Sequence, residues 1–271
     1  MTTAELARPD ALTADPNSVH AFLSVLRRDL VVTGRELPIF LAQVILQPLF
    51  LLFIFGKVLG SLGYTTPQYA HLLFPGIVAL TVTLTGIQST ALPLVLEFSF
   101  SREIEDRLLA PLPTWSVAIE KMLFASMRAL LAAVVMFPVG IWVLGSIPWR
   151  ANALGFFVLV MILGALAGSA IGLTLGTLVP PNRIQVMFAL ILTPMLFTGC
   201  SQYPWPSLAH LRWFQVVTAF NPMTYVSEGM RAALTPSVPH MRPWLCLLGL
   251  VVSVLLFTII GVRGFLKRAI D

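Results

Sequence analysis

The amino-acid sequence predicts an all-α membrane protein with six transmembrane helices. Of its 271 residues, 57% are hydrophobic and 11% are charged, whereas about a quarter of the residues in ordinary soluble domains are charged. The charged residues also cluster, which leaves long apolar runs between them. Because an unpaired charge at the centre of a bilayer costs about 3 kcal/mol, this pattern excludes a soluble globular protein.

Six segments approach or exceed the roughly 20 apolar residues that a helix needs to cross a bilayer. They are residues 38–59, 70–96, 117–145, 151–179, 184–200 and 243–262. The fifth segment is short, and Pro194 interrupts it. Residues 1–17 are polar and contain two prolines, so we expect a flexible tail without the pattern of a cleavable secretory signal.

The distribution of Lys and Arg predicts that both termini lie in the cytoplasm. An even number of spans places the two termini on one side, and the flanks on that side carry most of the basic residues. These residues are Arg8, Arg27, Arg28, Arg35, Arg102, Arg107, Lys121, Arg183, Arg263, Lys267 and Arg268. The opposite side carries Lys57, Arg150, Arg212, Arg231 and Arg242.

Residues 18–35 predict a separate amphipathic helix before the first span. Val19, Phe22 and Leu26 recur at helical spacing, while Arg27 and Arg28 fall on other faces. Gly34 and Pro38 are typical helix-ending residues. Such a helix lies in the membrane interface with its apolar side down. Its role is either a simple anchor or a mechanical link to a partner.

The sequence contains no motif typical of an enzyme or of a nucleotide-binding protein. There is no phosphate-binding G-x-x-x-x-G-K-[ST] loop, no H-E-x-x-H and no G-x-S-x-G. Cys200 and Cys246 lie at the edges of apolar runs, which favours buried small side chains over a disulfide or a metal site. We therefore expect no catalytic residues, metal or cofactor in this chain. The net charge of +5 marks a membrane surface and not a nucleic-acid partner.

The segment between the second and third spans carries a cluster of charged residues. Residues 101–113 combine a mixed-sign charge cluster with two leucines and a proline stop, which fits either a solvated loop or a short helix that docks into a soluble partner. The cluster and its leucines are Arg102, Glu103, Glu105, Asp106, Arg107, Leu108 and Leu109.

In the fourth span, glycines 164, 168, 172 and 176 recur every four residues. This spacing predicts close helix packing, and packing within one subunit is favoured over a dimer seam between two subunits.

The stretch 198–234 is too interrupted for a plain crossing. Two short amphipathic pieces, about 207–218 and 222–234, flank Asn221 and Pro222. Such a unit can enter the outer leaflet as a re-entrant hairpin if protein shields its backbone. Glu228 and Arg231 are three residues apart and can pair on one helix face, where a structural role is favoured over substrate contact.

Two motifs in this order resemble the type-2 ABC exporter permease family. The first is the charged segment ending in Leu108, Leu109 and Pro111, and the second is Thr198-Gly199 followed by the Asn221-Pro222-x-Thr224-Tyr225 run and Arg231. The similarity covers nearly the whole chain after residue 18. It extends to actinobacterial drug-resistance and polyketide-export permeases, and to nodulation-factor and polysaccharide export permeases.

The resemblance implies a location in the bacterial cytoplasmic membrane and a domain of residues 36–271. It implies a connecting helix at 18–35, a cytoplasmic coupling helix at about 101–112 and a re-entrant gate hairpin at about 201–234. Within the hairpin, Asn221, Pro222, Tyr225 and Arg231 occupy recurring family positions. Glu105-Asp106-Arg107 replaces the G-T-L/M step of many relatives, so the match to the partner is expected to be specific.

The resemblance also implies partners: two copies of a separate ATPase that binds ATP and Mg, a second or related permease, and membrane lipids. The implied activity is export of a hydrophobic or amphipathic substrate by alternating access. Phe40, Gln43, Gln47 and Phe50 share helical spacing in the first span and form one candidate substrate face, although helix packing explains each of them equally well. An ATPase-independent secondary transporter and a membrane scaffold remain alternatives.

Overall fold

The computed structural model describes residues 16–98 and 113–270, and all regular structure in these ranges is helical. Five helical stretches are long and apolar enough to cross a membrane: Leu37–Ser61, Gln68–Leu96, Thr114–Leu144, Ala151–Leu178 and Pro243–Arg268. They belong to α1 (Pro16–Leu51) with its continuation through α2 (Leu59–Ser61), and to α3 (Pro67–Leu96), α5 (Thr114–Leu144), α6 (Leu154–Leu178) and α10 (Pro243–Ile270). The chain is therefore a multi-pass membrane protein.

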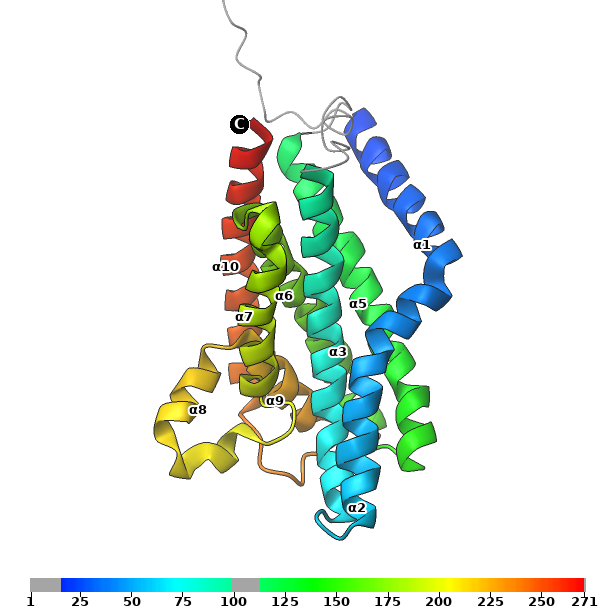
Figure 1. The fold of residues 1–271 in the computed structure, drawn as a ribbon, viewed down its shortest axis with the longest axis vertical. Coiled ribbons are helices and arrows are strands. Elements are labelled where there is room, and N and C mark those ends of the chain that lie inside the picture. The colour runs from blue at the N-terminus through cyan, green and yellow to red at the C-terminus, as the bar shows by residue number, and fades with distance from the viewer. Residues whose placement is uncertain (1–15, 99–112, 271) are drawn as a thin grey trace, which may run out of the picture.

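The fifth predicted span corresponds to a shorter helix, α7 (Ile184–Thr198), which contains Pro194. Its 15 residues extend about 22 Å, whereas the hydrocarbon core of a bilayer is about 30 Å thick. The other five predicted spans match long helices within a few residues. The start of α1 and the end of α10 lie at the same end of the bundle, while α2 lies at the opposite end (Figure 1).

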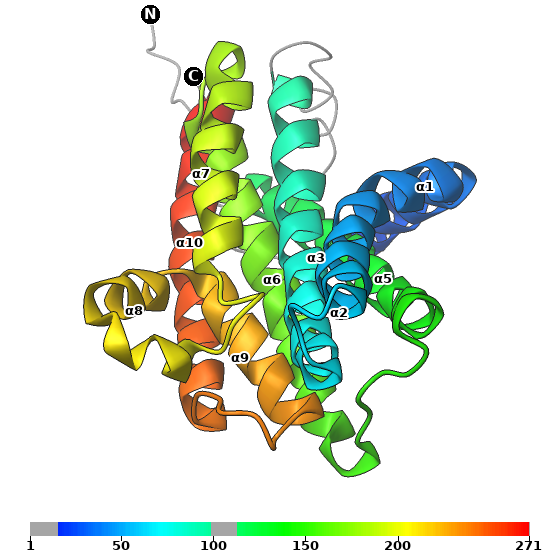
Figure 2. The same cartoon turned by 60° about the horizontal axis from the view of Figure 1, so that its bottom comes forward.

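The helix α3 forms the centre of the bundle. Both views place it between α1 and α5 on one side and α7 and α10 on the other (Figure 1 and Figure 2). In its apolar stretch 83% of the residues are buried, against 17% in that of α1. The buried hydroxyls of Thr81 and Thr90 donate to carbonyl oxygens one turn earlier, at 2.8 and 2.9 Å. These two hydroxyls thereby have partners inside the apolar core.

Glycines bring α6 into close contact with α3, as their four-residue spacing predicts. A Cβ atom at Gly168 would stand 2.5 Å from the carbonyl oxygen of Thr83, and one at Gly172 would stand 2.5 Å from that of Ile87. A side chain at either position would therefore collide with the α3 backbone. The glycine face therefore packs against another helix of the same chain, which confirms the predicted packing within one subunit.

The helix α1 runs without a break through residues predicted to end it. Gly34 and Pro38 both lie inside α1, so the expected boundary between residues 18–35 and the first span is wrong. A proline ring normally clashes with the carbonyl four residues earlier. That carbonyl belongs to Gly34, the residue with the least restricted backbone, which gives the helix room to adjust. The placement of 18–35 at the membrane surface stays a prediction.

Three short helical segments form the hairpin that precedes the last span. They are a 3-10 segment (Trp205–His210), α8 (Arg212–Ala219) and α9 (Pro222–Leu234). The expected division at Asn221 and the second expected piece, 222–234, match the structure, whereas the first expected piece, about 207–218, is interrupted at Leu211. The other predicted connector, with Arg102, Glu103, Glu105, Asp106, Arg107, Leu108 and Leu109, lies outside the described residues.

Candidate functional site

The helix α9 begins at Asn221, whose side chain joins it to α7. The Asn221 Oδ1 accepts a hydrogen bond from the Met223 amide at 2.9 Å, and Pro222 fills the first helical position. An Asn cap followed by Pro is a favourable helix start because the first N–H groups have no partner within the helix. The Asn221 Nδ2 donates to the Met195 carbonyl at 2.8 Å and to Thr198 Oγ1 at 2.9 Å.

One face of α9 then binds the carbonyl oxygens at the end of α7. Ser227 and Arg231 donate to the carbonyls of residues 199 and 200, at 2.7 and 2.9 Å. The Thr224 hydroxyl shares its one hydrogen between the carbonyl of residue 198, at 3.2 Å, and the closer carbonyl of Thr218, at 2.6 Å. The last carbonyls of a helix have no partner within the helix, and here side chains three and four residues apart supply them. We call this set of bonds from α9 to residues 198–200 the α9 clasp.

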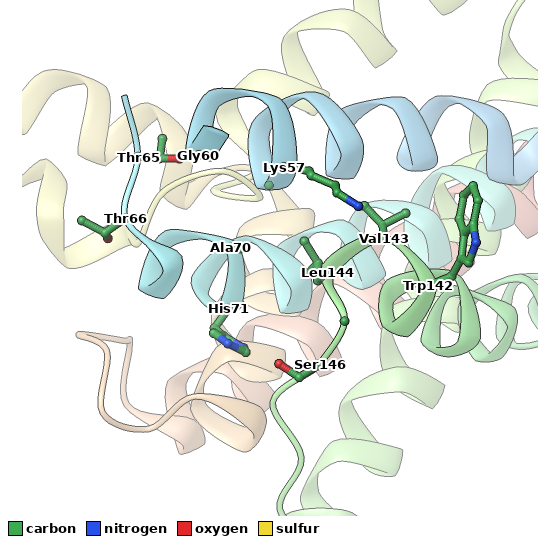
Figure 3. Close-up of a pocket in the computed structure, with 12 residues that line it drawn as sticks. Lys57, Gly60, Thr65, Thr66, Ala70, His71, Trp142, Val143, Leu144 and Ser146 are labelled. Carbon is green, nitrogen blue, oxygen red and sulfur yellow. The ribbon is translucent and has the colours of Figure 1, made fainter. Parts of the chain in front are cut away.

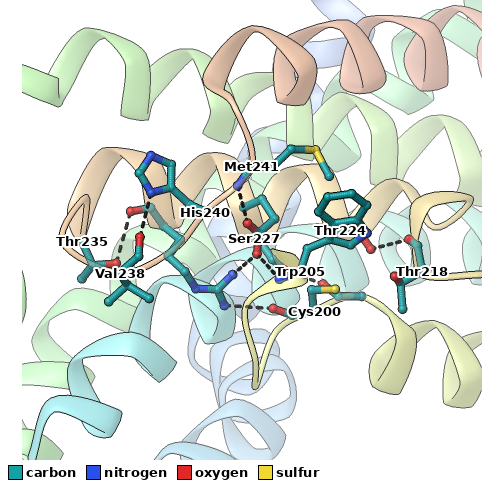
Figure 4. A network of polar contacts seen from close by, with 12 residues as sticks. Cys200, Trp205, Thr218, Thr224, Ser227, Thr235, Val238, His240 and Met241 are labelled. Atoms are coloured by element: carbon teal, nitrogen blue, oxygen red, sulfur yellow. Dashed lines mark hydrogen bonds and ion pairs between the residues drawn. The ribbon is translucent and has the colours of Figure 1, made fainter. Parts of the chain in front are cut away.

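The predicted pair of Glu228 and Arg231 is confirmed. Both side chains are fully buried and form an ion pair. The carboxylate of Glu228 also accepts bonds from the backbone amides of Trp205, at 2.9 Å, and Met241, at 2.7 Å. The pair therefore joins both ends of the hairpin to α9, as the polar network in Figure 4 shows. This arrangement supports the structural interpretation over substrate contact.

The hairpin also packs on the long helices. Tyr225 Oη donates to the Ala219 carbonyl at 2.6 Å, and its ring lies against Gly249 of α10. A Cβ atom at Gly76 of α3 would stand 1.8 Å from the carbonyl oxygen of Ser201. The hairpin backbone therefore rests directly on the central helix.

Both cysteines are buried and free, as predicted. Cys200 adopts a positive φ of 52° at the turn after α7. A buried thiol is shielded from reagents and is a poor nucleophile. Among the described residues, no three His, Cys, Asp or Glu side chains gather where they could hold a metal ion.

A groove lies between α1, α3 and α7, with a volume of about 610 Å³. This volume is in the range of small-molecule sites. Apolar side chains from all three helices line it, and Gln47 of α1 and Gln88 of α3 add amide groups. Its lining comprises Gln47, Leu51, Phe55, Leu84, Gln88, Phe188, Ala189, Leu192, Thr193, Leu196, Phe197 and Gln202.

The four residues of the candidate substrate face in the first span lie in different surroundings. Gln43 and Gln47 line a small adjoining cavity beside Thr81 and Thr85, and Gln47 also reaches the groove. Phe40 is buried, and the guanidinium carbon of Arg128 lies 4.1 Å from its ring centre. Phe50 is 54% exposed. The two phenylalanines thus lie outside the groove lining, and any contact of theirs with substrate stays a prediction.

Sequence reasoning assigned no role to Thr224 and Ser227, which make two of the three bonds of the α9 clasp. Polar residues at positions 221, 224, 227, 228 and 231 share one helix face, and that spacing was an available signal. Residues 198–200, on the other side of the clasp, could not be identified from the sequence by such spacing. Their backbone carbonyls accept the bonds, and any residue type supplies a carbonyl.

Comparison with known proteins finds one matching family. Residues 20–235 match the family model described as "ABC-2 type transporter". The chain is 27% identical to the ycf38 transport permease of Cyanophora paradoxa over 217 residues, which cover 77% of this chain and 72% of that protein. It is 26% identical to ycf38 of Porphyra purpurea, over 87% of this chain and 81% of the relative. It is 24% identical to the inner membrane transport permease YadH of Escherichia coli K12, over 66% and 68%.

Proposed function

The chain belongs to the ABC-2 type transporter family as a transmembrane permease, and we propose that it serves an exporter that moves a hydrophobic or amphipathic substrate out across the cytoplasmic membrane of a bacterium. Drugs, lipids, glycolipids and polyketides belong to this substrate class. The permease itself is not catalytic. It pairs with a separate ATPase, proposed as two copies that bind ATP and Mg, and with a second or related permease.

The groove between α1, α3 and α7 supports this proposal. Its walls are largely apolar, and Gln47 and Gln88 place two amides where a substrate can accept or donate hydrogen bonds. A site of mostly apolar lining with a few polar groups suits an amphipathic molecule. Because α7 is largely exposed along Val186, Leu190 and Phe197, it is the wall best able to move and to admit substrate from the lipid side.

We propose six crossings with both termini in the cytoplasm, in which α7 and the hairpin together complete the fifth. The start of α1 and the end of α10 lie at one end of the bundle, which supports this topology (Figure 1). In this topology the α9 clasp lies near the outer surface and shapes an outer gate. Residues 18–35 form the connecting helix, and residues 101–112 form the coupling helix that receives the stroke of the ATPase.

Reconstitution with the ATPase tests the function. The full chain and its ATPase should transport a fluorescent lipid across proteoliposomes only when ATP and Mg are present. An ion gradient without ATP should drive no transport. Transport that follows the gradient and needs no ATPase would identify a secondary transporter and overturn the proposal.

The coupling role has its own test. Replacing Leu108 and Leu109 with Asp should uncouple ATP hydrolysis from transport while the permease remains folded, because two charges would replace the apolar side chains that enter the ATPase groove. Unchanged transport together with unchanged ATPase association would remove the coupling role from residues 101–112.

A further inference from the structure

A second cavity lies at the end of the bundle opposite the C-terminus, where three spans end together. It has a volume of about 500 Å³ and lies between the end of the first span, the start of α3 and the end of α5. Figure 3 shows Lys57 on one helix and His71 on another, with Ser146 on the turn after α5. Nothing in the proposed export path uses this cavity.

The polar groups of the cavity are basic or neutral. Lys57 and His71 supply the nitrogen groups, and Thr65, Thr66 and Ser146 supply hydroxyls. No carboxylate lines the cavity. The buried ion pairs Lys121–Glu97 and Arg231–Glu228 lie outside this cavity, and no described acidic residue lines it beside Lys57. This chemistry favours an anion from outside the chain.

The surroundings of the cavity share its charge. Segments 59–73, 140–155 and 199–245, which form this end of the bundle, contain one acidic residue, Glu228. That carboxylate is fully buried and already bound. Arg150, Arg212 and Arg242 lie exposed in the same segments. A surface with basic groups and no free acid attracts anions over several ångströms.

The cavity lies at the ends of three spans, which is the level of the lipid headgroups in a membrane. The spans Leu37–Ser61, Gln68–Leu96 and Thr114–Leu144 end or begin around it. Trp142 lines it and is 76% exposed, and Tyr64 beside it is 78% exposed. Exposed Trp and Tyr side chains are typical of the membrane–water interface. Lys57 lies in a π-helical segment, Leu52–Val58, and such segments often occur at functional sites.

We propose that this cavity binds the headgroup phosphate of an anionic phospholipid from the leaflet at that end. Lys57 provides the charge, and the hydroxyls of Thr66 and Ser146 donate hydrogen bonds to phosphate oxygens. Val143 and Leu144 add apolar surface on the same wall, which suits the glycerol and upper acyl carbons of a lipid and offers nothing to free phosphate.

Native mass spectrometry of the full chain in mild detergent tests the site. The probes are dioleoyl phosphatidylglycerol, dioleoyl phosphatidylcholine and inorganic phosphate. Wild type should retain phosphatidylglycerol in preference to phosphatidylcholine, and excess inorganic phosphate should not displace it. Lys57→Gln should weaken this retention about fivefold, a typical effect of losing one partly exposed charge contact. Lys57→Arg should restore it.

Arg212→Gln is the matched control, because it removes one positive charge from the same end of the bundle outside the cavity. Its retention of phosphatidylglycerol should equal that of wild type. If Lys57→Gln does not fold, Ser146→Ala, which removes a proposed hydrogen-bond donor to the phosphate, should also lower this retention. The proposal would be overturned if the cavity variants retained as much phosphatidylglycerol as wild type. It would also be overturned if Arg212→Gln lost as much as Lys57→Gln, or if inorganic phosphate displaced the lipid fully.

Discussion

Lys121 of α5 forms an ion pair with Glu97 at the C-terminal end of α3, and both side chains are buried. The two residues come directly before and shortly after the segment 99–112 that lies outside the described residues. The pair therefore fixes the separation of the two helix ends between which the proposed coupling helix is held. If residues 101–112 form the coupling helix as proposed, a displacement of that segment would pass through this pair to both helices.

Breaking this pair should destabilise the permease. Lys121→Met leaves the Glu97 carboxylate buried without its counter-charge, which typically costs about 3–5 kcal/mol. The melting temperature of the purified complex should fall, and the double variant Glu97→Gln with Lys121→Met should recover part of the loss. A Lys121→Met protein as stable as wild type would show that the pair contributes nothing.

The buried pair in the hairpin should be still less tolerant of substitution. Arg231→Ala removes the counter-charge of Glu228 and the donor to the Cys200 carbonyl, so a loss of about 3–5 kcal/mol is expected. Thermal unfolding in detergent measures it, with the exposed Arg242→Ala as a control that should behave like wild type. Normal stability with an altered substrate preference would instead place Arg231 in the transport path.

The glycine face of α6 predicts a steric effect. Gly172→Ala would bring a Cβ to 2.5 Å from the Ile87 carbonyl oxygen, and α3 must move to accept it. Overpacking of this kind costs about 1–3 kcal/mol, visible as reduced thermal stability. Gly155→Ala on the same helix has nothing within 4 Å of its new Cβ and should be neutral. Equal stability of the two variants would contradict the close packing.

The features that the sequence predicted well depend on residue type alone. Hydrophobicity locates the long helices because each apolar residue contributes independently of the fold. The glycine spacing predicted close packing of α6 within one subunit for a similar reason, since only small residues permit it, and the structure identifies α3 as the neighbour. Asn221 divided the hairpin correctly because its capping chemistry is local.

The surroundings of the candidate substrate face depend on contacts distant in sequence. Helical spacing relates residues 40, 43, 47 and 50. The Phe40 ring nevertheless contacts the guanidinium of Arg128, whereas Gln47 lines the groove. The helix α1 contains Pro38 and Pro48, and prolines inside a helix bend it and change which neighbour each residue meets. Spacing within one helix cannot specify that bend.

The groove predicts a change in transport without a change in stability. Gln47→Leu and Gln88→Leu keep the side-chain size and remove the amides from the two walls, so a substrate that hydrogen-bonds there should lose about tenfold in transport efficiency, equivalent to one good hydrogen bond. Transport into proteoliposomes measures this. Gln68→Leu, exposed at the start of α3, is the control. Unaltered transport of every substrate by both groove variants would remove the groove from the path.

The buried thiol of Cys200 offers a probe of whether the α9 clasp opens. Because the Cys200 thiol is buried, Cys200 should resist maleimide in the resting complex. Ser207→Cys, at an exposed position in the 3-10 segment, should be labelled within minutes. If the outer gate works by releasing the clasp, adding ATP should expose the thiol, so labelling of Cys200 should accelerate. Labelling that stays equally slow during active transport would show that residues 198–200 remain bound to α9 throughout the cycle, and the gate would then have to lie elsewhere.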